Sequence, residues 1–255
     1  MAYFKYKSSN VHFEEIGKGN PLFLLHGNTA SSKMFDYVVD LYKDDFKIIL
    51  IDFLGHGNSD RLNQFPIDFW YDQAMQAISL ITLNDYGKVN LIGTSGGALA
   101  ALNVALERSD LVNKVIADSF EGEKAVGSIA RYIPEERKQS KSTENARMFW
   151  EYCHGEDWES VVDNDTTVVI KHEKSIKKFF HKDLSNLCVP VMLTASLEDN
   201  FAQVAGLDFG QLYKAMSDKI ADGKLHLFPS GGHPAMLTNA EEFSVVAKKF
   251  FIDCK

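Results

Sequence analysis

Alternating apolar and polar residues open the chain, and continuous apolar runs follow them. The alternating stretches, 3–6 and 11–16, are typical of strands that expose one face to solvent. A central strand covered on both faces needs an unbroken apolar run instead. Such a run predicts a buried strand at 21–25, and 47–51 is a second one. Further strands are predicted at 89–92, 112–117, 189–194 and 224–228.

Helical spacing of apolar residues separates these runs. It predicts helices over 31–40, 68–83, 98–107, 203–220 and 241–251. Strands that alternate with helices form a mostly parallel sheet with helices on both faces, because each crossover must pass over one face of the sheet. The pattern therefore predicts an α/β fold.

The alternation stops between Phe120 and Leu187. This stretch is charged and rich in aromatic residues, with helical patches such as 144–152. A segment that leaves a sheet after one strand and returns before the next lies over the strand ends, where open α/β sheets bind ligands. We expect residues 1–119 and 188–255 to form the catalytic core, and residues 120–187 to form an inserted, largely helical cap.

The composition is that of an ordinary globular enzyme. The chain has 255 residues, of which 45% are apolar, and 18 are Phe, which is enough apolar material for one core. The formal charge of −8 argues against a nucleic-acid partner, because phosphate binding needs a basic field. No segment has the apolar core of a signal peptide or a membrane span, so we expect a cytoplasmic protein without a membrane partner. Nothing in the sequence indicates an oligomeric state.

The three cysteines indicate neither a disulfide framework nor a zinc site. Cys153, Cys188 and Cys254 are odd in number, far apart and without a CxxC pair. We interpret them as reduced thiols. We expect no metal and no cofactor.

A serine stands directly after the predicted strand 89–92. Gly93-Thr94-Ser95-Gly96-Gly97 matches GxSxG, and helix-forming alanines follow it. A serine on such a strand-to-helix turn is held in a strained conformation with its hydroxyl exposed, and the glycines leave room for strand and helix. GxSxG also occurs in flexible loops, but the strand before it and the helix after it favour a nucleophile. We predict Ser95 as nucleophile and the Gly96 N–H as a donor to an oxyanion.

Histidines follow two other predicted strands. His26-Gly27-Asn28-Thr29 comes after one of them, and the backbone N–H of Asn28 could supply a second oxyanion donor. We interpret His26 and His56 as residues that fix their loops by hydrogen bonding. A metal site built from His56, Asp52 and Asp60 is disfavoured, because no HxH or HExxH spacing orients two ligands together.

A fourth motif, Gly231-Gly232-His233, lies on a glycine turn after the strand predicted at 224–228. A histidine at this place, near the chain's end, can reach across the carboxyl edge of the sheet to a serine far away in sequence. Of the eight histidines, His233 has the best position for a general base.

In this order the motifs resemble the α/β-hydrolase superfamily: an HG loop, DxxGHGxS, GxSxG, a late acid and GGH. The resemblance covers the predicted core on both sides of the insertion. It implies the α/β-hydrolase fold and a triad that runs serine, acid, histidine along the chain. An acid is therefore expected between Ser95 and His233, at the end of a strand. A serine at the elbow argues against the haloalkane dehalogenase and epoxide hydrolase branches, which carry an aspartate there.

Two neighbouring acids are candidates for this position. The superfamily usually has GxxD here, whereas this chain has Ala195 in place of the glycine, Glu198 at the fourth position and Asp199 next. We choose Asp199, because Asn200-Phe201 resembles the residues after the superfamily's aspartate, and Glu198 stays an alternative. A third candidate, Asp118, ends another strand, although capping that strand end is the stronger interpretation.

The resemblance implies acyl transfer through Ser95, with no metal or cofactor. The favoured function is hydrolysis of a carboxylic ester of a small or medium apolar substrate. Cleavage of amides or peptides (proline-iminopeptidase-like), thioesters, lactones or carbon–carbon bonds needs the same triad and stays open. A non-catalytic small-molecule receptor is less favoured, because the triad residues are intact.

Aromatic residues are candidates for the substrate pocket. We predict that Phe149 and Trp150 of the insertion, and Phe201 of the core, bind a small-molecule substrate. Aromatic residues at helical spacing also commonly attach a cap to its domain. Further candidates in the insertion are Tyr152, Trp158, Phe179 and Phe180.

Overall fold

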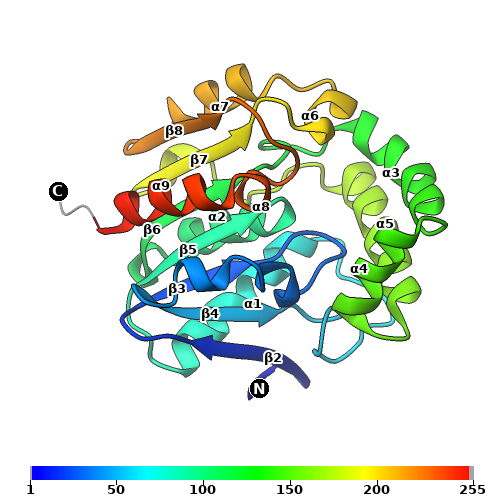
Figure 1. The fold of residues 1–255 in the computed structure, drawn as a ribbon, viewed down its shortest axis with the longest axis horizontal. Helices are drawn as coiled ribbons and strands as arrows, with labels where there is room; N and C mark the ends of the chain where they lie inside the picture. Colours follow the sequence, from blue (N-terminus) through cyan, green and yellow to red (C-terminus); the bar gives the residue numbers. More distant parts are fainter. Residues whose placement is uncertain (1, 253–255) are drawn as a thin grey trace.

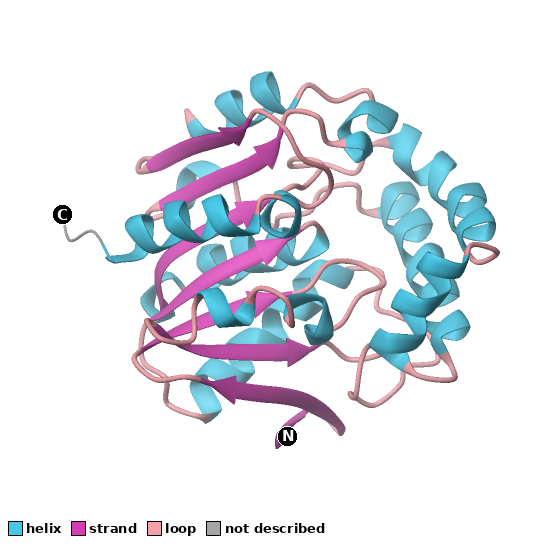
Figure 2. Ribbon diagram, in the orientation of Figure 1, coloured by secondary structure: helices cyan, strands magenta, loops and turns pink. Residues whose placement is uncertain are grey.

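The computed structural model describes residues 2–252, which form a twisted central sheet with helices on both faces (Figures 1 and 2). The sheet has eight strands in the order β1-β2-β4-β3-β5-β6-β7-β8. The strands are β1 (Ala2–Tyr6), β2 (Ser9–Ile16), β3 (Asn20–Leu25), β4 (Phe46–Asp52), β5 (Val89–Thr94), β6 (Val112–Asp118), β7 (Val191–Ser196) and β8 (Gly223–Phe228). Strands β3 to β8 pair in parallel, whereas β1 and β2 are antiparallel. The predicted mostly parallel α/β sheet is confirmed.

Burial of the strands follows their sequence pattern. Every residue of β5 and β7, which lie inside the sheet, is buried. Strand β1 lies at an edge and exposes three of its five residues. The inner strands are thus covered on both faces, whereas the edge strand keeps one face open to solvent.

The two faces of the sheet pack against different helices, as alternate residues of β3 show. Phe23 and Leu25 join the larger core cluster, which includes residues of α1, α2 and α7. Leu22 and Leu24 join the second cluster, with residues of η1, η2, α8 and α9. The bounds are α1 (Phe69–Leu83), α2 (Gly96–Glu107), α7 (Phe209–Ser217), α8 (Ala235–Thr238), α9 (Ala240–Ile252), and the short 3-10 segments η1 (Ser32–Phe35), η2 (Val39–Leu41), η3 (Ser109–Leu111) and η4 (Leu184–Asn186).

The helix predicted over 31–40 was wrong in type. The chain forms the two 3-10 segments η1 and η2 there. The buried residues Met34, Phe35, Val38, Val39 and Tyr42 lie three or four positions apart, which is the spacing that predicts one helix from the sequence. The two 3-10 segments are separated by residues 36–38, so this spacing does not extend into one continuous α-helix.

The helix predicted over 203–220 is two helices, α6 (Asn200–Ala205) and α7. Gly206 ends α6 with a left-handed backbone, at φ +69°, a conformation that glycine adopts without strain. Asp208 then caps α7 by accepting a hydrogen bond from the backbone of Gln211. The early start of α6 places Asp199 at its N-cap.

Three helices lie between β6 and β7, and we call residues 127–175 the helical insertion. They are α3 (Gly127–Ser140), α4 (Glu144–His154) and α5 (Trp158–Ser175). In Figure 1 the arrows of the parallel strands point toward these helices, so the insertion lies beyond the carboxyl ends of the strands. A β-bridge between Lys124 and Lys178 joins the two ends of this segment. The predicted helical insertion is confirmed, whereas the domain boundaries at 119/120 and 187/188 stay a prediction.

Two of the three cysteines lie in the described part of the chain. Cys153 is buried and Cys188 exposed, and both are free thiols. Cys254 lies outside the described residues. Within residues 2–252, no helix combines the length and apolar character needed to cross a membrane.

Candidate active site

Ser95 occupies the turn between β5 and α2 in a strained conformation. Its φ is +53° and its ψ is −123°, which is rare for a residue with a side chain. Its backbone N–H donates to the carbonyl oxygen of Asp118 at 2.8 Å, which ties the turn to the end of β6. The flanking glycines are required, because a Cβ on Gly93 would lie 2.1 Å from the carbonyl oxygen of Gly97. The strain is thus imposed by the packing of strand against helix, and it presents the hydroxyl above the sheet.

His233 links Ser95 to Asp199. Its Nε2 lies 3.0 Å from Ser95 Oγ, and its Nδ1 lies 2.9 Å from Asp199 Oδ2. A carboxylate can only accept a hydrogen bond, whereas a serine hydroxyl can donate one. The neutral ring therefore carries its proton on Nδ1 and leaves Nε2 free to accept the serine proton.

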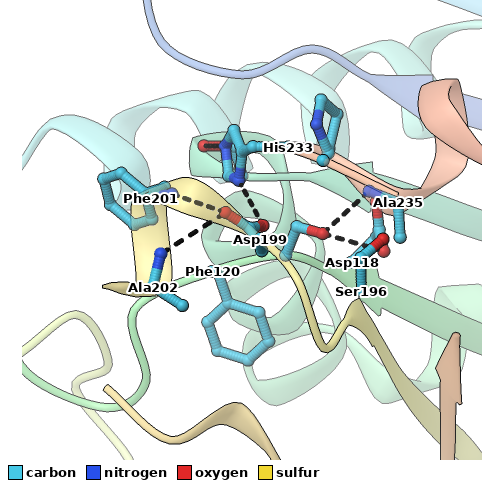
Figure 3. A network of polar contacts seen from close by, with 12 residues as sticks. Asp118, Phe120, Ser196, Asp199, Phe201, Ala202, His233 and Ala235 are labelled. Carbon is cyan, nitrogen blue, oxygen red and sulfur yellow. Dashed lines mark hydrogen bonds and ion pairs between the residues drawn. The ribbon is translucent and has the colours of Figure 1, made fainter. Parts of the chain in front are cut away.

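Asp199 is held by the first turn of α6. Its Oδ1 accepts hydrogen bonds from the backbone N–H groups of Phe201 at 2.8 Å and Ala202 at 3.4 Å. Figure 3 shows the carboxylate between this turn and His233. The side chain is fully buried. One oxygen caps a helix while the other holds the imidazole, so the carboxylate has a single orientation.

The two alternative acids have other surroundings. Glu198 is exposed. Asp118 is fully buried and accepts hydrogen bonds from the backbone of Met236 and the hydroxyl of Thr194. Burial raises the pKa of Asp118 to about 7, although these hydrogen bonds oppose the shift. Asp118 therefore holds the backbone of the chain just after His233. It does not hydrogen-bond to the imidazole of His233.

Two backbone N–H groups lie near Ser95 as predicted donors. Within residues 2–252, neither the N–H of Asn28 nor that of Gly96 has a hydrogen-bond acceptor. The two residues are in close contact, because a Cβ on Gly96 would lie 2.0 Å from Asn28 Oδ1. A Cβ on Gly27 would likewise lie 3.0 Å from the Cβ of Ser95. Two unpaired donors beside a nucleophile can stabilise an oxyanion.

A cavity of about 390 Å³ opens over Ser95. Core and insertion both contribute to its wall, which is mostly apolar. Its lining includes Trp70, Leu99, Phe120, Ile129, Tyr132, Ile133, Trp150, Val169, Phe201 and Val204 around Ser95 and His233, with Asn28, Thr29, Gly96, Glu121, Glu136, Arg137 and Asn200 as the remaining residues. A volume of this size holds a small organic molecule.

Known proteins resemble this chain in sequence and in structure. A family model described as the alpha/beta hydrolase fold matches residues 20–145. Serine hydrolase BPHL from Homo sapiens is 25% identical over 262 residues, which cover 94% of this chain and 82% of the relative. The solved structure of the esterase EaEST from Exiguobacterium antarcticum matches with a TM-score of 0.74 at 19% identity, over 96% of each chain. The chain therefore has the α/β-hydrolase fold.

A shorter similarity links this α/β-hydrolase to another hydrolase. The (E)-2-((N-methylformamido)methylene)succinate hydrolase of Acinetobacter baylyi is 31% identical over 106 residues, which cover 41% of this chain and 39% of that protein. The names of these relatives give one specific substrate, one class of bond and, for serine hydrolase BPHL, no substrate. The comparisons therefore establish a hydrolase and leave its substrate class open.

The cavity of this α/β-hydrolase includes two of the three predicted substrate-binding residues. Trp150 and Phe201 line it, whereas Phe149 does not. Phe149 is 39% exposed. Neighbouring residues of a helix project about 100° apart, so α4 cannot direct both aromatic rings into the cavity.

The other aromatic candidates of the insertion lie outside the cavity, in packing or hydrogen-bonding contacts. Trp158 stacks on Trp150 with ring centroids 5.4 Å apart. Phe179 stacks on His172, and Phe180 is buried. Tyr152 is about half exposed and donates its hydroxyl to Asp36. None of the four lines the cavity over Ser95.

The histidines that follow the first strands hold loops of this α/β-hydrolase together. His26 donates from Nδ1 to the carbonyl oxygen of Gly27 and accepts at Nε2 from the backbone of Phe53. Burial lowers the pKa of His26 to about 3, so the ring stays neutral. His56 is fully buried and stacks on Phe65. Both rings therefore stabilise the loops below the site.

Asp52 and Asp60, the other members of the disfavoured metal site, bind different partners. Asp52 contacts Nδ1 of His12 at 3.0 Å and accepts from the backbone of Asn58. Asp60 accepts from the backbone of Asn10. The two carboxylates thus hold separate loops.

Two charged residues of the site were missed from the sequence, Asp165 and Arg137. Asp165 is fully buried on α5, and Arg137 Nη1 of α3 lies 2.7 Å from its Oδ1. Burial alone would raise the pKa of Asp165, but Arg137 and the nearby His56 hold it at about 2. The sequence did contain a signal for Asp165. This residue falls on the apolar stripe of α5, between the buried Val161 and Val168. A charge on such a stripe requires a buried partner.

Glu121 was missed as well. It follows β6, lines the cavity, and accepts a hydrogen bond from the backbone of Val126. Burial raises the pKa of Glu121 to about 7, against the effect of that hydrogen bond. Its charge in the cavity therefore changes near neutral pH.

Proposed function

We propose that this α/β-hydrolase is a serine hydrolase that cleaves a carboxylic ester of a small or medium apolar substrate through an acyl-enzyme on Ser95. The observation that carries the proposal is the pair of contacts made by His233, 3.0 Å to Ser95 Oγ and 2.9 Å to Asp199 Oδ2. A hydroxyl, a neutral imidazole and a buried carboxylate in this order are the parts that activate a serine. The apolar wall of the cavity supports an apolar acyl group.

In the first half of the reaction, Ser95 Oγ attacks the ester carbonyl carbon while His233 Nε2 takes the serine proton. The carbonyl oxygen becomes an oxyanion and accepts hydrogen bonds from the N–H groups of Asn28 and Gly96. When the intermediate collapses, His233 gives its proton to the leaving alcohol. Asp199 stays ionised throughout and stabilises the imidazolium.

In the second half, water attacks the acyl-enzyme. His233 takes a proton from the water, the same two N–H groups bind the second oxyanion, and the proton then passes to Ser95 Oγ as the acid leaves. The ring of Phe201 packs on the imidazole with centroids 5.0 Å apart. This contact keeps His233 in the orientation that both halves use.

The helical insertion acts as a cap in this proposal. Ile129 of α3, Trp150 of α4 and Val169 of α5 all line the cavity over Ser95. Apolar side chains at this place exclude water from the acyl group and limit its length. We take the cap to be residues 120–187.

The test is a panel of 4-nitrophenyl esters and matched 4-nitroanilides, measured with the wild-type protein and with Ser95→Ala. We expect turnover of the esters that disappears in Ser95→Ala. Turnover confined to the anilides would mean that the substrate is an amide and not an ester. Ester turnover that persists in Ser95→Ala would contradict the proposed nucleophile.

A further inference from the structure

The helical insertion holds the loop that carries Asn28. We call residues 26–29 the oxyanion loop. The side-chain Nδ2 of Asn28 donates to Asp165 Oδ1 at 3.1 Å, and the backbone N–H of Thr29 donates to Asp165 Oδ2 at 3.2 Å. Asp165 lies 136 residues further along the chain than Thr29, on α5. One carboxylate of the insertion therefore holds two consecutive residues of a core loop.

Thr29 has a backbone conformation that needs such support. Its φ is +54°, in the left-handed region that β-branched residues strongly disfavour. Asp165 accepts a hydrogen bond from the backbone N–H of Thr29. The Nε2 atom of His154 donates to the carbonyl oxygen of Thr29 at 3.0 Å. The Nδ1 atom of His154 accepts from the backbone of Gly57, which leaves the proton on Nε2. Two helices of the insertion thus keep Thr29 in its strained state.

Asp165 is itself held by several partners. It is fully buried, and Arg137 Nη1 lies 2.7 Å from its Oδ1. The same Nη1 donates to Thr166 Oγ1 at 2.9 Å. His56 Nε2 lies 3.8 Å from Asp165 Oδ2. A carboxylate surrounded in this way presents its oxygens to the oxyanion loop in a single orientation.

The opposite side of Asn28 is also restrained. Its Oδ1 accepts a hydrogen bond from Trp70 Nε1 at 3.0 Å. That oxygen lies against Gly96, where a Cβ would approach it to 2.0 Å. The position of the Asn28 backbone N–H relative to the Gly96 N–H is therefore determined between Asp165 and Trp70.

We propose that Asp165 is a positioning residue, which holds the backbone N–H of Asn28 where the oxyanion forms. The inference rests on the proposed function, because it assigns Asn28 to the oxyanion hole. Such donors act through preorganisation, since they must already point at the developing charge. Without Asp165, Thr29 can relax to an ordinary backbone conformation and turn the neighbouring N–H away. The insertion then controls transition-state stabilisation in addition to forming the pocket.

Asp165→Asn tests the proposal, with Asp163→Asn as its matched control. The control makes the same change on the same helix, at an exposed carboxylate that pairs with Lys141 on the surface. We expect Asp165→Asn to lower kcat on 4-nitrophenyl butyrate on the order of a hundredfold, as loss of one oxyanion donor does. KM should stay within about threefold, because the ester is bound as before. Rates are normalised to active sites titrated to completion with a fluorophosphonate, so that unfolded protein does not count.

A purely structural role for Asp165, as the partner of buried Arg137, gives a different result. The amide in Asp165→Asn leaves Arg137 without its anion, and this can unfold the protein. The variant Arg137→Gln/Asp165→Asn removes both charges and should fold. Adding Thr29→Gly to it supplies a residue that adopts φ +54° without strain. We expect this addition to restore kcat by about tenfold or more, which no repair of the ion pair would explain.

The outcomes separate the two proposals. Equal normalised kcat values for Asp165→Asn and Asp163→Asn would overturn the positioning role alone. A loss of kcat in Arg137→Gln/Asp165→Asn that Thr29→Gly does not reduce would also overturn the positioning role. Absence of any Ser95-dependent ester turnover in the wild-type protein would overturn the proposed function, and the positioning role with it.

Discussion

Asp199 holds His233 with one carboxylate oxygen at 2.9 Å and caps helix α6 with the other. In the proposed mechanism, the same side chain therefore serves the fold and the chemistry. An asparagine at this place can still accept at one oxygen and cap the helix. It cannot accept the Nδ1 proton of His233 with the charge that stabilises an imidazolium.

For this reason Asp199→Asn should lower kcat on a reactive 4-nitrophenyl ester on the order of ten-thousandfold while the protein stays folded. Steady-state kinetics and circular dichroism of the purified variant provide the measurement. Glu198→Gln is the control, because Glu198 is the neighbouring acid and is exposed. A large loss in Glu198→Gln with little change in Asp199→Asn would mean that Glu198, and not Asp199, is the acid of the triad.

Ser95 and His233 should act as one unit. Ser95→Ala and His233→Ala should each lower kcat on the order of a millionfold. The double variant should lose little more, because Ser95 and His233 contribute to the reaction only together. A fluorophosphonate should add once to the wild-type protein and not to Ser95→Ala, as measured by intact-mass spectrometry. Losses that multiply in the double variant would contradict a shared role.

Trp150 should limit the length of the acyl group. It lines the cavity over Ser95, and each methylene buried there contributes about 0.8 kcal/mol, or roughly fourfold in kcat/KM. Trp150→Ala should move the optimum of a 4-nitrophenyl ester series, from acetate to decanoate, toward longer chains. Acetate, which is too short to reach the cap, should react nearly as before.

The neighbouring Phe149 is the matched control for this series. Its ring lies outside the cavity and is 39% exposed. Phe149→Ala should therefore leave the chain-length profile unchanged. Equal losses at every chain length in Trp150→Ala would show that Trp150 only attaches the cap, through its stack on Trp158.

Glu121 should make the stability of the protein depend on pH. Its pKa is about 7 in the folded protein against an ordinary 4.5, because burial disfavours the charge. The folded state therefore holds the proton more tightly than the unfolded state. The stabilising effect is complete below pH 4.5 and is lost as the pH rises through about 7. Glu121→Gln, which stays neutral, should gain up to about 3 kcal/mol relative to wild type between pH 4 and pH 8.

Urea unfolding of both proteins across that pH range measures the difference. Glu123→Gln is a suitable control, since Glu123 pairs with Lys219 near the surface. A difference between Glu121→Gln and wild type that stays constant with pH would contradict the raised pKa, because it would show that Glu121 has the same pKa in the folded and unfolded states.

The local sequence determined the elements and the chemistry of the elbow. A strand buried on both faces needs an unbroken apolar run, and a serine on a strained turn needs glycines on either side. Both requirements concern residues only a few positions apart, as in the strand and turn of residues 89–97. The buried strands and Ser95 could therefore be predicted from one segment at a time.

Tertiary structure was needed to separate residues that are neighbours in sequence, although resemblance already favoured Asp199 over Glu198. Glu198 and Asp199, like Phe149 and Trp150, differ in which way the backbone directs the side chain, and that direction depends on where β7 and α4 pack. Asp165 is a stronger case, because its partners lie on a loop 136 residues earlier and on another helix of the insertion. A buried charge indicates that partners exist, whereas only the packing of α5 against the oxyanion loop determines which residues they are.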